Sequence, residues 1–268
     1  MKKVHIILFS ILGGLLIITG VLFGAVFRLR SIDVTIADGA NLSISEQEII
    51  ELTEFGDKAP IFTIDKDKAI KNIESQYPKI KVIQIKTTSV MSVEIRVRER
   101  IEMFYAKYND SSYYILDEEL KVLRLDSVEP SNLIDISGEY LAINDNTKQC
   151  DFLSTEEIRN VTYNLFASFI TTVDYNGQPV LSREKVCEMV QKVTFTTGYT
   201  KYGQYTKLVL TLRDSVKVEI AKPESNLQEK INICFSAYED LTQDKKVEGT
   251  IIKYYLTKDG DEKVGVKF

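Results

Sequence analysis

The feature that most constrains this chain is an uncharged run of 24 residues, from Val4 to Phe27, close to its N-terminus. At about 1.5 Å per helical residue the run spans roughly 36 Å, enough to cross a hydrocarbon core of about 30 Å with some tilt. The alternative is a cleaved signal peptide, whose apolar core is about 7 to 15 residues and ends at small residues. Bulky Leu22 and Phe23 stand near the end of the run. We therefore predict an uncleaved transmembrane helix over 4–27.

The orientation of this helix is only weakly specified by charge. Lys2 and Lys3 on one side are balanced by Arg28 and Arg30 on the other, so the count of basic residues does not decide it. The free amino terminus and the long C-terminal part, which crosses largely regardless of charge, favour a cytoplasmic tail over 1–3 and extracytoplasmic domains.

Two glycines suggest a contact inside the membrane. Gly20 and Gly24 form a small-xxx-small pair, a spacing that lets another helix approach closely. Glycine is also simply common in membrane helices, and this second interpretation stays open.

Composition excludes several functions for the remainder of the chain. Residues 31–268 hold 30 of the 34 basic side chains and all 39 acidic ones, a balance that disfavours binding to nucleic acid. The single histidine, His5, lies at the membrane run, which excludes zinc-histidine clusters and histidine-dependent triads from the main domains. Cys150, Cys187 and Cys234 lie in or beside apolar stretches and are expected as small buried residues, with a disulfide as the open alternative.

Periodicity after the membrane run predicts a small α+β unit. A strand over 29–36 is followed by a helix with a Ser45–Glu48 capping box and by a second helix that Asp65 caps and Pro78 ends. Strands over 80–87 and 93–97 complete a strand-helix-helix-strand-strand order.

The alternation continues past this unit, because Ile101, Met103 and Tyr105 keep the parity of Val97. One long strand is therefore expected to connect the first unit with the next. Glu99 interrupts its apolar face and requires a partner if buried, with Arg100 or a nearby basic side chain as the natural candidate; a bulge or an exposed bend is the equal alternative. We expect Glu99 and Arg100 at the junction between two domains.

The second part of the chain predicts strands with interposed helices. A hairpin is expected around Asp117–Glu119, with these carboxylates as a solvated turn rather than an acid-base pair. A second capping box, at Ser154 and Glu157, opens a longer helix. The pattern continues with helices over 182–189 and 226–241, a strand near Val193 and alternating strands over 208–212 and 216–220, and it closes with segments over 250–256 and 264–268 on either side of a turn.

Catalytic signatures are absent from the sequence. It contains no GxGxxG, Walker, CxxC, GxSxG or SxxK motif, so we expect no enzymatic activity, no cofactor and no metal site. An enzyme would have to use carboxylates or tyrosine without histidine.

The order of these parts resembles the FtsQ/DivIB family of bacterial cell-division proteins. The resemblance implies an α+β chain with a single transmembrane helix, a POTRA domain over 29–100 and an FtsQ/DivIB-type β-rich domain over 101–268. Departures, such as Ile101-Glu102 where the family usually has a proline after Glu-Arg, indicate a divergent member. The matching segments are Phe62 with Ile64-Asp65, Tyr77-Pro78 with Ile80, Val93–Val97 running into Glu99-Arg100, Tyr113–Val122, Val216–Ile220, Leu227, Lys230 and Ile251–Tyr255.

The resemblance also implies a function. Such proteins are non-enzymatic scaffolds at the division septum that bind FtsL-like and FtsB/DivIC-like coiled-coil proteins and help control septal peptidoglycan synthesis. An edge strand near the C-terminus can accept a partner strand through main-chain hydrogen bonds. We expect that strand to be Thr250, Ile251, Ile252, Lys253, Tyr254 and Tyr255, with the two tyrosines as anchors, although both could serve only the domain's own packing. A membrane-anchored POTRA-like chaperone or secretion accessory is the alternative function.

Overall fold

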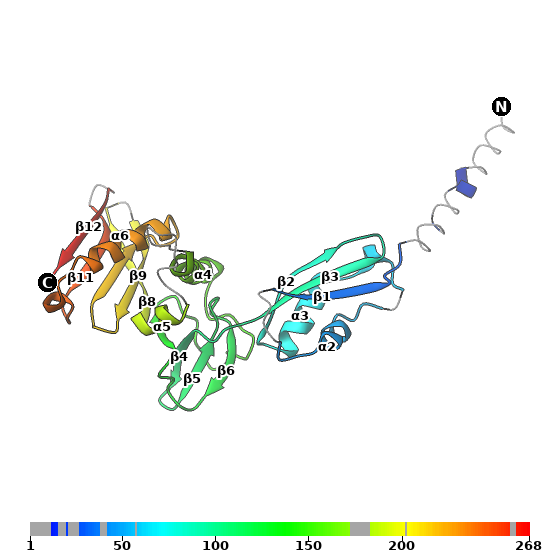
Figure 1. Ribbon diagram of the computed structural model, residues 1–268, viewed down its shortest axis with the longest axis horizontal. Coiled ribbons are helices and arrows are strands. Elements are labelled where there is room, and N and C mark those ends of the chain that lie inside the picture. Colours follow the sequence, from blue (N-terminus) through cyan, green and yellow to red (C-terminus); the bar gives the residue numbers. More distant parts are fainter. Residues whose placement is uncertain are drawn as a thin grey trace. The chain divides into compact units, whose positions relative to one another are not determined.

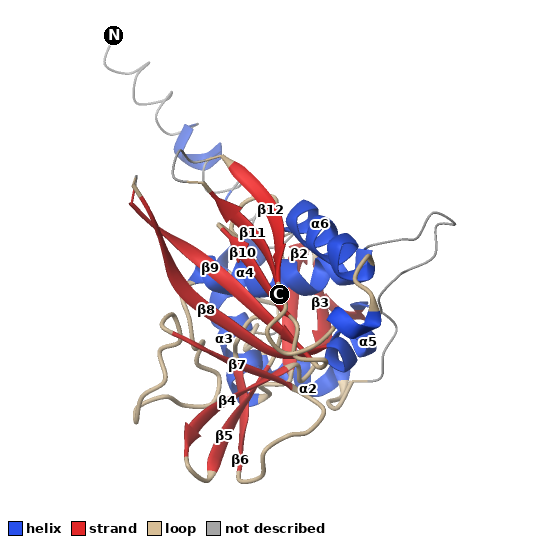
Figure 2. Ribbon diagram, turned by 90° about the vertical axis from the view of Figure 1, so that its left-hand side faces the viewer, coloured by secondary structure: helices blue, strands red, loops and turns tan. Residues whose placement is uncertain are grey.

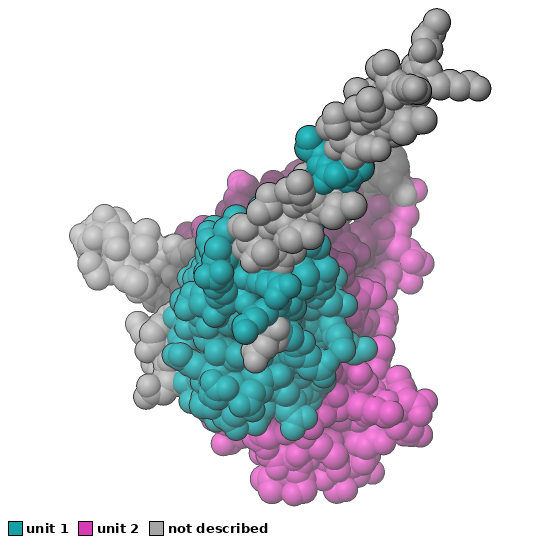
Figure 3. Space-filling model, turned by 90° about the vertical axis from the view of Figure 1, so that its right-hand side faces the viewer, with its two compact units in different colours: residues 1–100 teal, residues 101–268 magenta. Residues whose placement is uncertain are grey.

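The computed structural model describes residues 12–15, 20, 27–37, 42–56, 58–171, 183–201, 203–257 and 261–268. The chain divides into two compact units, Met1–Arg100 and Ile101–Phe268, shown in teal and magenta in Figure 3. Each unit has a hydrophobic core of its own. Both units combine helices with sheets, which confirms the predicted α+β class.

The first unit is a three-stranded sheet with two helices on one face (Figure 1). The strand order is β1-β3-β2, with β1 parallel and β2 antiparallel to the central β3. Its elements are β1 (Ser31–Ile36), α2 (Glu46–Leu52), the 3₁₀ turn η2 (Ile61–Thr63), α3 (Lys66–Gln76), β2 (Ile80–Thr87) and β3 (Ser92–Glu99).

Local capping signals position both helices of the first unit as predicted. The hydroxyl of Ser45 accepts the Glu48 N–H at 3.3 Å, and a Glu48 carboxylate oxygen accepts the Ser45 N–H at 3.0 Å, which is a complete capping box. Asp65 caps α3 by accepting the N–H of Lys68 at 3.0 Å. The helices then bury Ile49 and Ile73 in one core with the apolar side chains of β3, with α2 packed on β1 and α3 on β2.

The long strand predicted to connect the two units does not form. β3 ends at Glu99, and the next strand, β4 (Phe104–Asn109), begins only at Phe104. The inward parity also changes, because β4 buries Phe104 and Ala106, whereas Tyr105 is half-buried. Residues 100–103 lie outside both sheets, so the alternation in the sequence crosses a break that periodicity alone cannot reveal.

The second unit is built on one nine-stranded mixed sheet, which fans from β12 to β6 in Figure 2. The strand order is β12-β11-β10-β9-β8-β7-β4-β5-β6, with parallel pairs at β10/β11, β7/β8 and β4/β7. Besides β4, the strands are β5 (Ser112–Leu116), β6 (Val122–Asp126), β7 (Ile134–Gly138), β8 (Val190–Thr200), β9 (Gly203–Leu212), β10 (Lys217–Ala221), β11 (Ile251–Leu256) and β12 (Glu262–Lys267). The helices are α4 (Glu156–Thr171), α5 (Arg183–Met189), α6 (Leu227–Glu239) and the 3₁₀ turn η3 (Gln243–Lys245).

Helices cover one face of this sheet, and polar pairs occupy parts of the other. α6 packs on β10, β11 and β12, and α4 packs on α6. The rings of Phe104 and Phe166 meet edge to face at 5.1 Å and join β4 to α4. On the opposite face, an ion pair between Lys192 and Asp135 links β8 to β7 at 2.6 Å. One covered and one solvated face is the usual arrangement for a sheet with antiparallel edges.

The hairpin carboxylates differ from the prediction. Asp117 and Glu118 are fully buried instead of forming a solvated turn. One Asp117 carboxylate oxygen accepts the N–H groups of Glu119 and Lys121 at 2.9 and 2.8 Å. The left-handed conformation of Leu120, with φ of 60°, closes this turn. The Asp117 carboxylate thus accepts hydrogen bonds from the backbone N–H groups of its own turn, which explains why this side chain is buried.

None of the helices that the structure describes is long and apolar enough to cross a membrane. The predicted span over 4–27 is described only at residues 12–15, at Gly20 and at Phe27. Gly24 lies outside the described residues, so the predicted contact of Gly20 and Gly24 stays a prediction.

Candidate partner-binding edge

The strand predicted to accept a partner is not at the edge of the sheet. β11 pairs with β10 on one side and with β12 on the other, so neighbouring strands of the chain flank it on both sides. The chain returns after β11 and lays β12 alongside it in antiparallel register, and this hairpin takes the edge position. The prediction of Thr250–Tyr255 as an exposed edge strand is therefore wrong in its geometry.

The side chains of this segment are mostly covered. Thr250 and Ile252 are buried, and the Thr250 hydroxyl donates to the carbonyl of Lys245 at 2.6 Å. Ile251, Lys253 and Tyr254 are half-buried, whereas Tyr255 is exposed. Of the two predicted anchors, only Tyr255 thus presents much of its ring to solvent.

The sheet edge near the C-terminus is β12. Within the described residues no strand pairs with its outer side. Val264, Val266 and Phe268 remain 44%, 39% and 64% exposed. Val264 and Val266 stand opposite Tyr254 and Ile252, on the face that α6 covers further inside the sheet. The edge therefore offers an apolar stripe beside α6, and Lys263 and Lys267 alternate with it on the opposite face.

The backbone of β12 is aligned for a further strand. The Thr257 N–H donates to the Asp261 carbonyl at 2.8 Å. These two residues stand opposite each other at the turn end of the β11/β12 ladder, next to the pair of Leu256 with Glu262. In an antiparallel pair, hydrogen-bonded and non-hydrogen-bonded positions alternate. Counting from the hydrogen-bonded pair of Thr257 with Asp261, the N–H and C=O groups of Val264 and Val266 point away from β11. These are the groups that an added strand would bond.

A buried cation lies behind the first residue of β12. Lys230 on α6 is 1% exposed, and its ammonium group donates to the carbonyls of Ala221 and Lys222 at 3.2 and 3.0 Å. The same nitrogen lies 3.3 Å from a carboxylate oxygen of Glu262, which begins β12. The other Glu262 oxygen accepts the Tyr254 hydroxyl at 2.9 Å. One carboxylate thereby joins α6, β11 and β12.

These contacts shift two ionisation equilibria in the network. The Tyr254 hydrogen bond and the positive charge of Lys230 hold the pKa of Glu262 below its usual range. Partial burial and the neighbouring Glu262 carboxylate raise the pKa of Tyr254 to about 12. Tyr254 therefore stays a hydrogen-bond donor, and Glu262 a carboxylate, throughout the neutral range.

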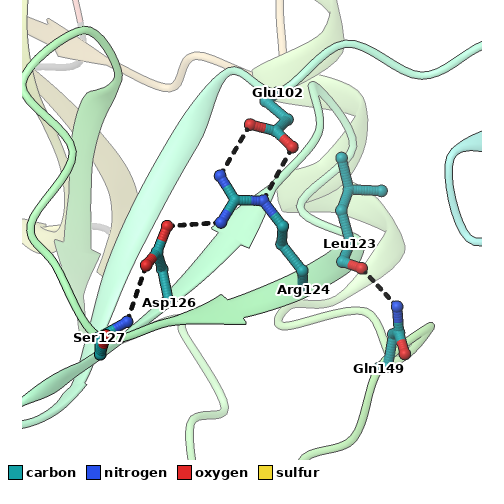
Figure 4. A network of polar contacts seen from close by, with 6 residues as sticks. All are labelled: Glu102, Leu123, Arg124, Asp126, Ser127 and Gln149. Carbon is teal, nitrogen blue, oxygen red and sulfur yellow. Dashed lines mark hydrogen bonds and ion pairs between the residues drawn. The ribbon is translucent and has the colours of Figure 1, made fainter.

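The opposite edge of the sheet is closed at the start of its strand. The loop after β7 bonds to β6, where the Val122 N–H donates to the Asp151 carbonyl at 2.8 Å and the Gln149 amide donates to the Leu123 carbonyl at 2.7 Å. Figure 4 shows this amide and, next to it, Arg124. Blocking an edge with a loop and charges is a common way to prevent unwanted strand pairing.

Arg124 forms the charged part of this closure. Its guanidinium group bonds both Glu102 oxygens at 3.0 and 3.1 Å and one Asp126 oxygen at 2.5 Å (Figure 4). The guanidinium holds the pKa of the Asp126 carboxyl below its usual range, aided by backbone donors. Of the two edges, β12 is thus the more accessible one.

Glu99 and Arg100 lie where the two compact units divide. Arg100 is not the ion-pair partner of Glu99 that the sequence suggested. Its guanidinium reaches back to Glu74 on α3, with 2.9 Å between Nη2 and Oε2, and its side chain is 2% exposed. Glu99 is half-buried and stands opposite Ile80 without a bulge, since the irregularity in this pair lies between Val82 and Gln84.

The first unit has the architecture of a POTRA module, a strand-helix-helix-strand-strand unit with the third strand in the centre of the sheet. Comparison with protein families agrees, because residues 27–100 match the model of the POTRA domain, FtsQ-type. The chain thus contains an FtsQ-type POTRA domain, which is consistent with the FtsQ/DivIB family. No curated protein sequence matches the chain.

Sequence reasoning missed the roles of Lys230 and Glu262. Lys230 follows Leu227 by three residues and precedes Cys234 by four, so it lies within the apolar stripe of α6. A lysine in such a stripe indicates a buried charge that needs a partner. The sequence gives no comparable signal for Glu262, because its partners come from distant elements.

Proposed function

We propose that this chain is a non-enzymatic scaffold of the bacterial division septum. In this proposal residues 4–27 anchor it in the cytoplasmic membrane with the N-terminus inside, and residues 29–268 bind other division proteins outside. The FtsQ-type POTRA domain is the observation that carries the proposal, because this type of domain suggests an FtsQ/DivIB-like division protein, and such proteins are typically non-enzymatic. The scaffold helps to control septal peptidoglycan synthesis.

The accessible edge at β12 supports a mechanism for partner binding. A segment of an FtsL-like or FtsB/DivIC-like coiled-coil protein adds a strand to β12, and its main-chain groups bond those of Val264 and Val266. The exposed valines and Phe268 receive its apolar side chains. The blocked edge at β6 leaves β12 as the favoured side of the sheet for this addition.

Localisation tests the cellular role. A fluorescent fusion in dividing cells of the source organism, combined with depletion of the gene, should give bands at mid-cell and filamentation or failed septa. Uniform envelope fluorescence with normal division would contradict the scaffold role. It would favour the POTRA-like chaperone or secretion accessory, which would bind exported chains instead of coiled-coil division proteins.

A proline substitution tests the binding mechanism. Val264→Pro removes an outward N–H while leaving the bonds between β12 and β11 in place, whereas Val264→Thr keeps both the N–H and the side-chain shape. We expect capture of the coiled-coil partners from membrane extracts to fall at least about tenfold for the proline variant and to stay near wild type for threonine. Equal capture by both variants, with intact folding, would contradict strand addition at β12.

A further inference from the structure

We infer that Lys230 is a positioning residue that holds the edge strand β12 in place from inside the domain. The inference rests on the proposed function only for the use of that edge by a partner. The link itself concerns this chain alone, so it can be tested without any partner.

The environment of Lys230 is that of a buried charge with a defined set of partners. The ammonium group is bonded to the carbonyls of Ala221 and Lys222 and lies 3.2 Å from the hydroxyl oxygen of Ser225. These acceptors are neutral, and the carboxylate of Glu262 supplies the opposite charge. A buried cation gains most from a carboxylate that stays in place, so Lys230 favours conformations in which Glu262 lies behind it.

Because of the position of Glu262, its contact with Lys230 affects the attachment of the edge strand β12. Glu262 is the first residue of β12, and it lies 32 positions after Lys230 in the sequence. β12 has a ladder on one side only and leaves Val264 and Val266 exposed, so apolar burial contributes little to its attachment. The contact of Glu262, whose side chain is 40% exposed, with the buried Lys230 therefore adds to the β11 ladder in fixing the strand at its first residue.

Tyr254 completes the arrangement from β11. Its hydroxyl donates to Glu262, and the ammonium nitrogen of Lys230 lies 5.3 Å from the centre of its ring. The tyrosine predicted as a partner anchor is thus engaged inside the domain, where it orients the carboxylate that Lys230 holds.

Segment-resolved hydrogen exchange of the detergent-solubilised full chain tests this role. Lys230→Met removes the cation at similar side-chain length, and Glu262→Gln removes the opposite charge. Lys192→Met is the matched control, because the pair of Lys192 with Asp135 lies in the same sheet and the lysine side chain is 40% exposed.

We expect each test variant to raise the exchange rate of the β12 amides at least about tenfold relative to the amides of β9. The control variant Lys192→Met should change the exchange rates of the β12 amides and of the β9 amides by less than about twofold. In the double variant the effect on β12 should not exceed that of the stronger single variant, because both substitutions break the same contact.

Two results would overturn the inference. Unchanged β12 exchange in both single variants would show that Glu262 is not needed to hold the strand. Equal acceleration in β12 and β9 would show that Lys230 supports the whole domain and not the edge. Loss of partner capture plays no part in this test, so failure of the proposed function would be seen separately in the Val264→Pro experiment.

Discussion

Single charged residues inside both units are held by long-range partners. In the first unit, Arg100 reaches Glu74, whose other carboxylate oxygen accepts the N–H of Val82 at 3.0 Å. The pair therefore ties the end of β3 to α3 and to β2. Breaking a buried pair of this kind is costly because it leaves a charge without its counterpart.

We predict that Arg100→Met lowers the free energy of unfolding of the first unit by about 3 kcal/mol. Urea unfolding followed by circular dichroism would measure the change. Lys68→Met is the control, since its pair with Glu54 has side chains 58% and 57% exposed and should alter stability little. A similar loss in both variants would contradict the special role of the buried pair.

The cysteines give a second prediction at this scale. Within the described residues no disulfide joins the three cysteines; Cys234 is buried, whereas Cys150 and Cys187 are half-buried. Burial raises the pKa of the Cys234 thiol to about 12. A maleimide reagent at about pH 7.5 should therefore modify Cys234 only after denaturation, as mass spectrometry of labelled peptides would show. Rapid labelling of Cys234 in the native protein would contradict its burial on the inner side of α6.

At the scale of elements, the two edges of the large sheet differ in what holds them. β6 is fixed by a loop and by Arg124, and β12 is fixed by β11 and by the contact of Glu262 with Lys230 and Tyr254. The attachment of β12 therefore depends on a titratable group.

We predict that acid weakens the attachment of β12. The pKa of Glu262 in the folded chain lies below its ordinary value of 4.5, because Tyr254, Lys230 and the nearby charge of Lys222 favour the carboxylate. The stabilisation is thus present above about pH 4.5 and is lost as the pH falls through the lower folded value. Protection of β12 relative to β9 should be constant from about pH 6 to pH 4.5 and drop below about pH 4.5, and Glu262→Gln should remove this dependence. A pH-dependent drop of equal size in the glutamine variant would point to other groups.

At the scale of the whole molecule, two separate cores predict independent unfolding. Ile95 is fully buried in the core of the first unit, whose members all precede residue 101. We predict that Ile95→Ala destabilises the first unit by about 3 kcal/mol and leaves the second unit unchanged. Hydrogen exchange at increasing urea concentration, followed in β3 and in β9, would resolve the two units. Joint loss of protection in both strands would contradict independence.

The sequence by itself determined the features that rest on neighbouring residues. The capping box at Ser45, the cap at Asp65, the β-branched run of β2 and the alternation of β3 and β10 are local patterns, and they predicted the order of the first unit and most elements of the second. The strand-helix-helix-strand-strand order was enough to indicate the POTRA resemblance.

Only the tertiary structure decided which strand lies at the edge of the large sheet and which charged side chains pair with each other. β11 is an inner strand because it pairs with β10, which lies far earlier in the chain, as well as with β12. The pair of Arg100 with Glu74 and the link of Lys230 to Glu262 likewise join distant residues. Periodicity reports which face of an element is apolar, but it carries no information about the partner that faces it, and the partner decides whether a charge is buried or an edge is open.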